Sequence, residues 1–115
     1  MTSLFHASSW GHLTTLAEGD EFTLNPGPQS AEGSGVYFSE GSERASASDS
    51  VYESGRHAAT IVLEAECATG WWRSKRSALK KKNRTRTWHS SCKAVKCQVL
   101  EIKGHLVYCQ WSFVS

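Results

Sequence analysis

The chain has 115 residues, of which 39% are hydrophobic, and carries a formal net charge of +2 at pH 7. This length and composition predict one domain with a single modest core. The sequence has no run of the roughly 18 apolar residues that a membrane span needs, and its N-terminus lacks a basic start followed by an apolar stretch, so a soluble cytoplasmic protein is expected.

The charge is divided unevenly along the chain. Residues 1–66 hold ten acidic residues and two arginines, whereas residues 67–115 hold eleven basic residues and one acid, Glu101. Eight of these bases and no acid fall within residues 73–86. A basic stretch of this density predicts an anionic partner.

The first part of the chain predicts a strand, a helix and a loop. Residues 3–8 (SLFHAS) are short, apolar and bounded by a turn, which is typical of a strand. A serine that follows can cap a short helix that runs to Leu16 and closes at Gly19. Residues 20–35 are rich in glycine, proline, serine and acids, so they predict an exposed loop.

The remaining elements alternate in the same way. Residues 35–39 (GVYFS) predict a strand, residues 42–55 a short helix, and residues 57–66 (HAATIVLEAE) the clearest strand of the chain. Residues 94–102 and 105–114 predict two strands joined by a tight hairpin. Together these elements predict an α+β domain with an antiparallel sheet and short helices.

The four cysteines do not predict a metal site. Cys67, Cys92, Cys97 and Cys109 follow neither a zinc-ligand spacing nor the dense spacing of a disulfide scaffold, so free thiols are expected.

Two short motifs on successive predicted strands carry the chemistry. The first strand ends in His6-Ala7-Ser8, and residues 33–39 form a glycine-x-glycine followed by an aliphatic residue, tyrosine, an aromatic and a small residue (GSGVYFS). In this order, followed by the strand at 57–66, they resemble the NAD-binding motifs of ADP-ribosyltransferases of the poly(ADP-ribose)-polymerase-like branch. The resemblance implies one compact domain over residues 1–115, a split antiparallel sheet, and NAD as cofactor.

The resemblance also implies a role for each motif residue. His6 donates to the ribose hydroxyls of NAD and the Tyr37 ring stacks on the nicotinamide. Small residues beside them let the dinucleotide approach the main chain closely. Ser46 then holds the carboxamide, and Tyr52 forms the other wall of the nicotinamide slot. The implied cofactor-binding residues are His6, Ala7, Ser8, Gly35, Tyr37, Ser39, Ser46 and Tyr52.

The third motif of the family departs from its usual form. A glutamate normally begins the penultimate strand, but that strand begins Lys96-Cys97-Gln98 here. Either Gln98 replaces the acid, or the alignment slips, or the acid is dispensable; Glu101 is the nearest acid, but on an alternating strand it lies on the opposite face from Gln98. Members without this acid transfer one ADP-ribose or are inactive. The resemblance therefore implies a mono-ADP-ribosyltransferase of toxin or phage-effector type, with catalytic residues His6, Tyr37, Gln98 and Glu101, and leaves an inactive binding module open.

Two further resemblances stand beside this one. Residues 83–90 (NRTRTWHS) are similar to a late segment of rifampin ADP-ribosyltransferases, which are small and lack the usual glutamate. Gly55-Arg56-His57 is similar to a segment of RNA 2′-phosphotransferases, in which an RNA phosphate is the attacking group. An RNA 2′-phosphotransferase is therefore the alternative enzyme.

Residues 71–89 form a basic, tryptophan-flanked insertion. Cationic side chains attract phosphate and indole rings stack on bases, so an anionic macromolecule is expected as acceptor, either RNA or DNA, or else an acidic protein. The protein itself is expected to be a monomer. The candidate partner-binding residues are Trp71, Trp72, Arg73, Lys75, Arg76, Lys80, Lys81, Lys82, Arg84 and Arg86.

Overall fold

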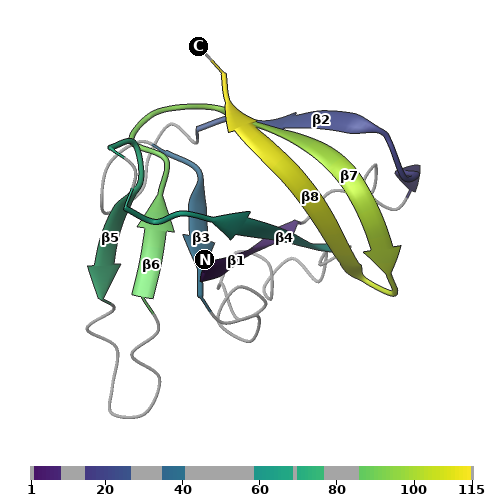
Figure 1. The fold of residues 1–115 in the computed structure, drawn as a ribbon, viewed down its shortest axis with the longest axis horizontal. Coiled ribbons are helices and arrows are strands. Elements are labelled where there is room, and N and C mark those ends of the chain that lie inside the picture. The colour runs from purple at the N-terminus through teal and green to yellow at the C-terminus, as the bar shows by residue number, and fades with distance from the viewer. Residues whose placement is uncertain are drawn as a thin grey trace.

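The structure, a computed structural model, consists almost wholly of strands in its described parts. These parts are residues 2–8, 15–26, 35–40, 59–68, 70–76 and 86–114, and for residues 74–76 only the main chain is described. The strands are β1 (Thr2–Ser8), β2 (Glu21–Leu24), β3 (Tyr37–Ser39), β4 (Ala59–Ala65), β5 (Arg73–Arg76), β6 (Arg86–His89), β7 (Val95–Lys103) and β8 (Leu106–Phe113). They form one sheet in the order β2-β7-β8-β4-β1-β3-β6-β5 (Figure 1).

The described residues form strands and almost no helix, and the sheet is mixed, so the predicted α+β domain with an antiparallel split sheet and short helices is wrong. Strands β1 and β4 pair antiparallel along their whole length, but β4 and β8 pair in parallel. A parallel strand is normally covered on both faces, and in β4 every residue except Glu64 is buried. In the run Ala-Thr-Ile-Val-Leu only Thr60 is polar, and side chains on both faces are buried, which suits this central position.

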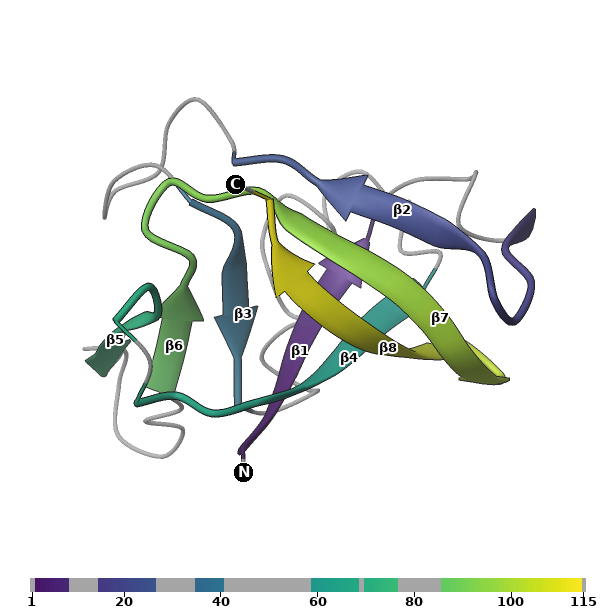
Figure 2. The same cartoon turned by 45° about the horizontal axis from the view of Figure 1, so that its top comes forward.

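The strands at the two ends of the sheet run in clearly different directions, as Figure 2 shows for β3 and β6 against β7 and β8. One face, called the core face here, carries the fully buried side chains Leu4, Ile61, Leu63 and Cys97, and also Phe38. Because the sheet is twisted, side chains from its two ends approach one another over the core face.

An aromatic cluster on the core face joins the two ends. Trp72, which precedes β5, packs edge-on against Phe38 of β3 and Trp111 of β8, with ring centroids 5.6 and 5.1 Å apart. Phe113 packs against both tryptophans, 5.2 Å from Trp72 and 4.9 Å from Trp111. Edge-to-face pairs of this kind stabilise a fold by about 0.5–1.5 kcal/mol each beyond area burial.

Four of the predicted elements are confirmed. The strands expected at 3–8, 35–39 and 57–66 appear as β1, β3 and β4. The hairpin of β7 and β8 also appears, with Gly104 in the left-handed region at a φ of 60°.

The exposed loop expected over residues 20–35 is wrong in part, because Glu21–Leu24 form β2 and pair with β7. Its side chains alternate, with Phe22 and Leu24 packed against the core and their neighbours exposed. The helix expected over residues 42–55, and most of the one expected to end at Leu16, lie outside the described residues. Within the described ranges, no helix is long and apolar enough to cross a membrane.

Candidate functional site

The two predicted NAD motifs lie on neighbouring strands. β1 and β3 are adjacent in the sheet, and among the described residues their pairing is limited to Phe5 opposite Ser39. Beyond this pair the imidazole of His6 makes the next contact between the strands. Its Nδ1 atom lies 2.8 Å from the carbonyl oxygen of Tyr37. The two motifs are therefore joined through a side chain where their strands separate.

The partner of His6 fixes its tautomer. A carbonyl oxygen only accepts, so Nδ1 must carry the hydrogen. Burial lowers the pKa of His6 from 6.5, and the bond to Tyr37 opposes this shift only in part, so the ring is neutral at pH 7. The Nε2 atom of this tautomer is an acceptor, and no described residue is its hydrogen-bond partner. The expectation that His6 donates to a ribose hydroxyl is thus reversed: a hydroxyl would donate to His6.

The rings of His6 and Tyr37 lie on different faces of the sheet. His6 stands inside β1 rather than at its end, and its ring packs on the core face against Phe38, with centroids 5.2 Å apart. Tyr37 precedes Phe38 on β3 and therefore points to the opposite face. The structure brings the two motifs together through the main chain of Tyr37, and it does not bring the two rings together.

The ring beside Tyr37 is His89, which the sequence reading did not single out. Tyr37 and His89 stand opposite one another on β3 and β6, with ring centroids 5.3 Å apart. The N–H of Ser91 donates to His89 Nδ1 at 3.3 Å, which leaves Nε2 as the protonated nitrogen of the neutral ring. Gly35 lies beside this imidazole, since a Cβ there would be 3.4 Å from His89 Nδ1, an ordinary van der Waals contact. His89 could have been predicted only if RTWH had been recognised as a strand that pairs with β3, because this pairing places His89 opposite Tyr37.

The small motif residues lie close by. Ser8 and Ser39 are buried, at the ends of β1 and β3, and Ala7 is half-buried on β1. Ser46 and Tyr52 lie outside the described residues. The part of the predicted site that can be placed is therefore the β1 and β3 motifs.

The two candidates for the third motif, Gln98 and Glu101, lie on β7, which β8 and β4 separate from β1 in the sheet. Gln98 is exposed on β7, opposite Gln110 of β8. A register shift between Val99 and Glu101 inserts Leu100 as an extra residue, which places Glu101 opposite Tyr108 and on the same face as Gln98. The expectation that Glu101 faces away from Gln98 is therefore wrong.

Neither candidate joins His6. The side chains that β7 presents to the core face, where the His6 ring lies, are Val95, Cys97, Val99 and Ile102. Gln98 and Glu101 are exposed on the other face, so the described residues of β7 supply no acid to His6.

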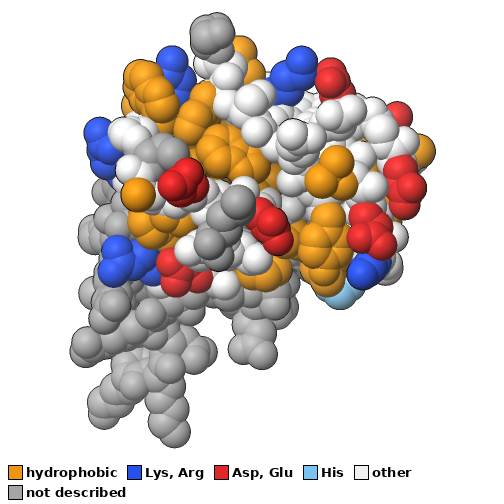
Figure 3. Space-filling model, viewed as in Figure 1, with side chains coloured by type: hydrophobic (Ala, Val, Ile, Leu, Met, Phe, Trp, Pro, Cys, Tyr) orange, Lys and Arg blue, Asp and Glu red, His pale blue; other side chains and the backbone are white. Residues whose placement is uncertain are grey.

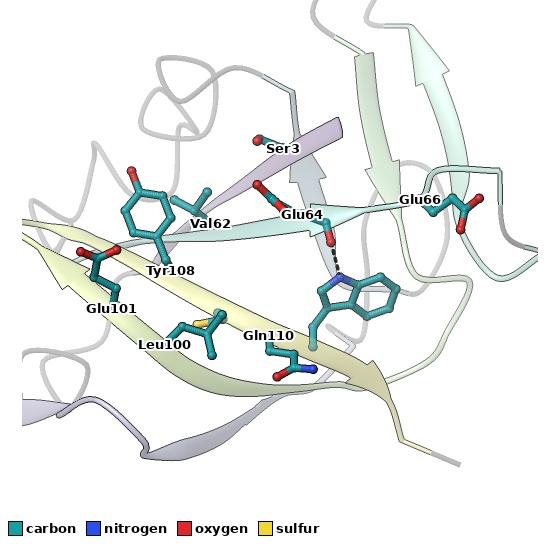
Figure 4. A pocket seen from close by; sticks show the side chains of 10 residues that line it. Ser3, Val62, Glu64, Glu66, Leu100, Glu101, Tyr108 and Gln110 are labelled. Carbon is teal, nitrogen blue, oxygen red and sulfur yellow. Dashed lines mark hydrogen bonds between the residues drawn. The ribbon is translucent and has the colours of Figure 1, made fainter. Parts of the chain in front are cut away.

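Glu101 instead lines a depression of about 670 Å³ on that other face. Figure 4 shows Glu101 and Tyr108 at one end of it, Glu66 at the other, and Glu64 between them. It begins where β4 and β8 separate, and the Trp111 indole bridges the gap by donating to the Glu64 carbonyl at 2.8 Å. Acidic side chains lie among hydrophobic ones on this surface (Figure 3). Three carboxylates repel the two phosphates of a dinucleotide, so this depression does not suit NAD.

The predicted basic insertion is in part an antiparallel ribbon, because β5 pairs with β6 along four residues. Trp72 is only 2% exposed, so its ring belongs to the core and is not available to a partner. Trp71 is 51% exposed, with the Lys93 ammonium 4.3 Å from its ring centroid. Arg73 is exposed, and Arg86 is half-buried over the Trp88 ring.

Other predicted partner residues cannot be placed in the same way. Lys75 and Arg76 lie in β5, where only the main chain is described. Outside the described residues lie Lys80, Lys81, Lys82 and Arg84.

The cysteines are free thiols. Cys97 and Cys109 are buried on neighbouring strands, and the Cys109 thiol together with burial raises the pKa of Cys97. Within the described ranges, no group of three or more histidine, cysteine, aspartate or glutamate residues is arranged to hold a metal ion.

Comparisons of the chain with protein-family models, with curated proteins and with solved structures found no match.

Proposed function

We propose that the protein is an NAD-dependent mono-ADP-ribosyltransferase whose NAD site lies where β1 and β3 separate. The observation that carries this proposal is the hydrogen bond from His6 Nδ1 to the Tyr37 carbonyl at 2.8 Å. It couples two motifs that are 31 residues apart in the sequence. These are the two motifs whose residue types resemble an NAD site.

The charge around Tyr37 supports the proposal. On the Tyr37 face, its cross-strand neighbour is His89, and the next residue across is Arg73. These groups are neutral or cationic, which suits the two phosphates of NAD, whereas the depression beside Glu101 is acidic. The dinucleotide therefore fits the β3 side of the sheet better than the β8 side.

His6 acts first as a positioning residue. Its Nδ1–H holds the main chain of Tyr37, and this fixes the ring that stacks on the nicotinamide. Because the rings of His6 and Tyr37 lie on opposite faces of the sheet, the ribose must enter the opening between β1 and β3 for one of its hydroxyls to donate to the neutral Nε2. An oxygen that donates to an imidazole is more electron-rich, which favours positive charge on the ribose as the nicotinamide leaves.

The transfer breaks the bond between ribose C1′ and nicotinamide, which departs with the bonding electron pair. The acceptor atom forms the new bond to C1′ and gives up its proton. Because β7 presents no acid to His6, this strand offers no carboxylate to activate a second ribose as acceptor. This supports transfer of a single ADP-ribose.

The test uses the full chain and NAD labelled in its adenylate phosphate, with nicotinamide release and labelled macromolecules measured together. We expect nicotinamide release and label on a macromolecule from a cell extract, and loss of both in His6→Ala. Absence of nicotinamide release with every acceptor would overturn the proposal. Turnover only with 2′-phosphorylated RNA would instead indicate a phosphotransferase.

A further inference from the structure

Three strands of the sheet end together beside Tyr37. Tyr37 begins β3, His89 ends β6 and Arg73 begins β5, and the registers place His89 opposite both of the others. Trp71 lies two residues before Arg73, and Lys93 lies four residues after His89. We call the surface formed by Trp71, Arg73, His89 and Lys93 the ribbon-end surface.

This surface combines an exposed ring with fixed cations. Half of Trp71 is exposed, and the Lys93 ammonium lies over its ring at 4.3 Å from the centroid. The Nη1 atom of Arg73 donates to the carbonyls of Gly70 and Trp72, which holds the guanidinium at the start of β5. A guanidinium has five N–H donors, so others can meet a phosphate.

The strands and turn that form this surface contribute no acid to it. The sequence has no aspartate or glutamate between Glu66 and Glu101, a span that includes the whole ribbon and the turn after it. Glu40, which directly follows β3, accepts a hydrogen bond from Trp88 Nε1. Its main-chain N–H donates to the Arg86 carbonyl, so it lies at the other end of the ribbon. An anion at the ribbon-end surface therefore meets cations without competition from a carboxylate of the ribbon or of the turn after it.

The turn that carries Lys93 is held rigidly. The buried Ser90 hydroxyl accepts from the Val36 N–H at 2.9 Å and donates to the Lys93 carbonyl at 2.5 Å. The Lys93 N–H returns to the Ser90 carbonyl at 3.1 Å. Ser91 and Cys92 between them take positive φ angles of 48° and 69°. Because the main chain of this turn is already hydrogen-bonded, binding of an anion by Lys93 does not have to order the turn.

From these contacts we infer that the ribbon-end surface binds single-stranded nucleic acid, with a base stacked on Trp71 and phosphates held by Lys93 and Arg73. A stacking ring needs an unpaired base, which favours a single strand over a duplex. An acidic protein would engage the cations but would leave the exposed indole unused. The contacts involve base faces and phosphates rather than the 2′-hydroxyl, so RNA and DNA should bind alike.

This inference deepens the proposed function, because His89 contacts Tyr37 and a strand bound here lies beside the proposed NAD site. The bound strand is then the acceptor of ADP-ribose. Only this last step rests on the proposed function. Binding of the strand does not need NAD.

Binding is measured on the full chain by fluorescence anisotropy without NAD, using a labelled mixed-sequence oligonucleotide as single-stranded RNA, as single-stranded DNA and as duplex. Trp71→Ala should weaken single-strand binding about five- to a hundredfold, and Trp71→Phe should recover most of it. Lys93→Gln should weaken binding and reduce the salt slope by about 0.7. The matched controls are Leu100→Ala, an exposed apolar side chain elsewhere, and Lys96→Gln, an exposed lysine on β7.

Equal effects of the test and control variants, tighter binding of the duplex, or no binding at low salt would overturn the inference. Circular dichroism of each variant separates loss of binding from loss of fold, and Trp71→Phe keeps the test valid if Trp71→Ala unfolds. A protein that releases nicotinamide but binds no oligonucleotide contradicts this inference alone. One that binds the oligonucleotide but never releases nicotinamide contradicts the proposed function alone.

Discussion

The Nδ1 atom of His6 donates to the carbonyl oxygen of Tyr37 at the point where β1 and β3 stop pairing. The bond gives His6 two separable roles. One is structural, because Nδ1 holds the Tyr37 main chain. The other is chemical, because Nε2 is an acceptor that no described residue uses. Substitutions that keep one nitrogen and remove the other distinguish the two roles.

His6→Ala should abolish NAD turnover and lower the free energy of unfolding by about 1–3 kcal/mol, because a part-buried carbonyl loses its donor. His6→Asn places an amide N–H near the position of Nδ1, so it should recover much of the stability but not the turnover. Urea denaturation and nicotinamide release measure the two effects. His105→Gln is the matched control, since His105 is exposed.

Full activity in His6→Asn would mean that His6 acts only through the Tyr37 carbonyl. Full activity in His6→Ala would remove His6 from the site altogether.

The lowered pKa of His6 predicts a pH-dependent stability. The unfolded chain binds a proton at His6 near pH 6.5, whereas the native chain does so only at lower pH. The free energy of unfolding contributed by His6 should therefore be fully present above pH 6.5 and fall as the pH drops below it. Urea denaturation at pH 7.5, 6.5 and 5.5 should show a steeper decline for the wild type than for His6→Asn. Parallel curves for the two proteins would show that the native His6 titrates normally.

The strands that the sequence predicted correctly have apolar segments that local patterns can detect. The segments at 35–39, 57–66 and the C-terminal hairpin are rich in β-branched and aromatic residues, and residues 3–8 form a short apolar run between serines. β2 was missed because its four residues lie among glycine, proline and acids, although Phe22 and Leu24 do alternate with polar neighbours. β5 was missed because RSKR carries no apolar residue, and only its pairing with β6 makes it a strand.

The candidate site could be predicted only as far as its motifs. The resemblance anticipated that His6 and Tyr37 belong together, and they are joined by a hydrogen bond. It did not predict that their rings face opposite sides, because that depends on the register of β3 against β1. His89 contacts Tyr37 through the pairing of β3 with β6. The two residues are 52 positions apart in the sequence, and no local pattern encodes such a contact.

Tyr37→Ala should raise the KM for NAD by about tenfold or more, whereas Tyr37→Phe should be mild, because the ring supplies the stacking surface. Initial rates of nicotinamide release over a range of NAD concentrations give both values. His89 packs against the same ring, so Tyr37→Phe should also leave the fold unchanged. Equal damage from the two substitutions would transfer the role to the phenol hydroxyl.

The thiols should differ sharply in reactivity. Cys92 is exposed, whereas Cys97 and Cys109 are buried and the pKa of Cys97 is raised by its neighbour and by burial. A thiolate is the reacting species, so iodoacetamide at pH 8 should modify Cys92 first and Cys97 only after unfolding. Peptide mass spectrometry with and without urea gives the order. Modification of Cys97 in the native protein as fast as Cys92 would mean that β7 and β8 open readily.

The extra residue in β7 leads to a last prediction. Leu100 is 56% exposed and stands at the register shift, with Val99 opposite Cys109 before it and Glu101 opposite Tyr108 after it. Deleting Leu100 lets Glu101 follow Val99 directly, so every other pair of the hairpin keeps its partner and its face. The free energy of unfolding should therefore change by no more than about 1 kcal/mol, since only a bulge and an exposed side chain are lost.

Deleting Gln110 of β8 is the matched control. The extra residue lies in β7, so it cannot take the place of Gln110, and the end of β8 shifts by one residue. This shift turns Trp111 and Phe113 away from the core face, because a one-residue slip reverses the side chains of a strand. This variant should be unfolded or destabilised by several kcal/mol, on the order of the cost of removing two core-packed side chains. Chemical denaturation of both deletions compares them directly. If the Leu100 deletion is as damaging as the Gln110 deletion, the register shift is required by the fold rather than tolerated by it.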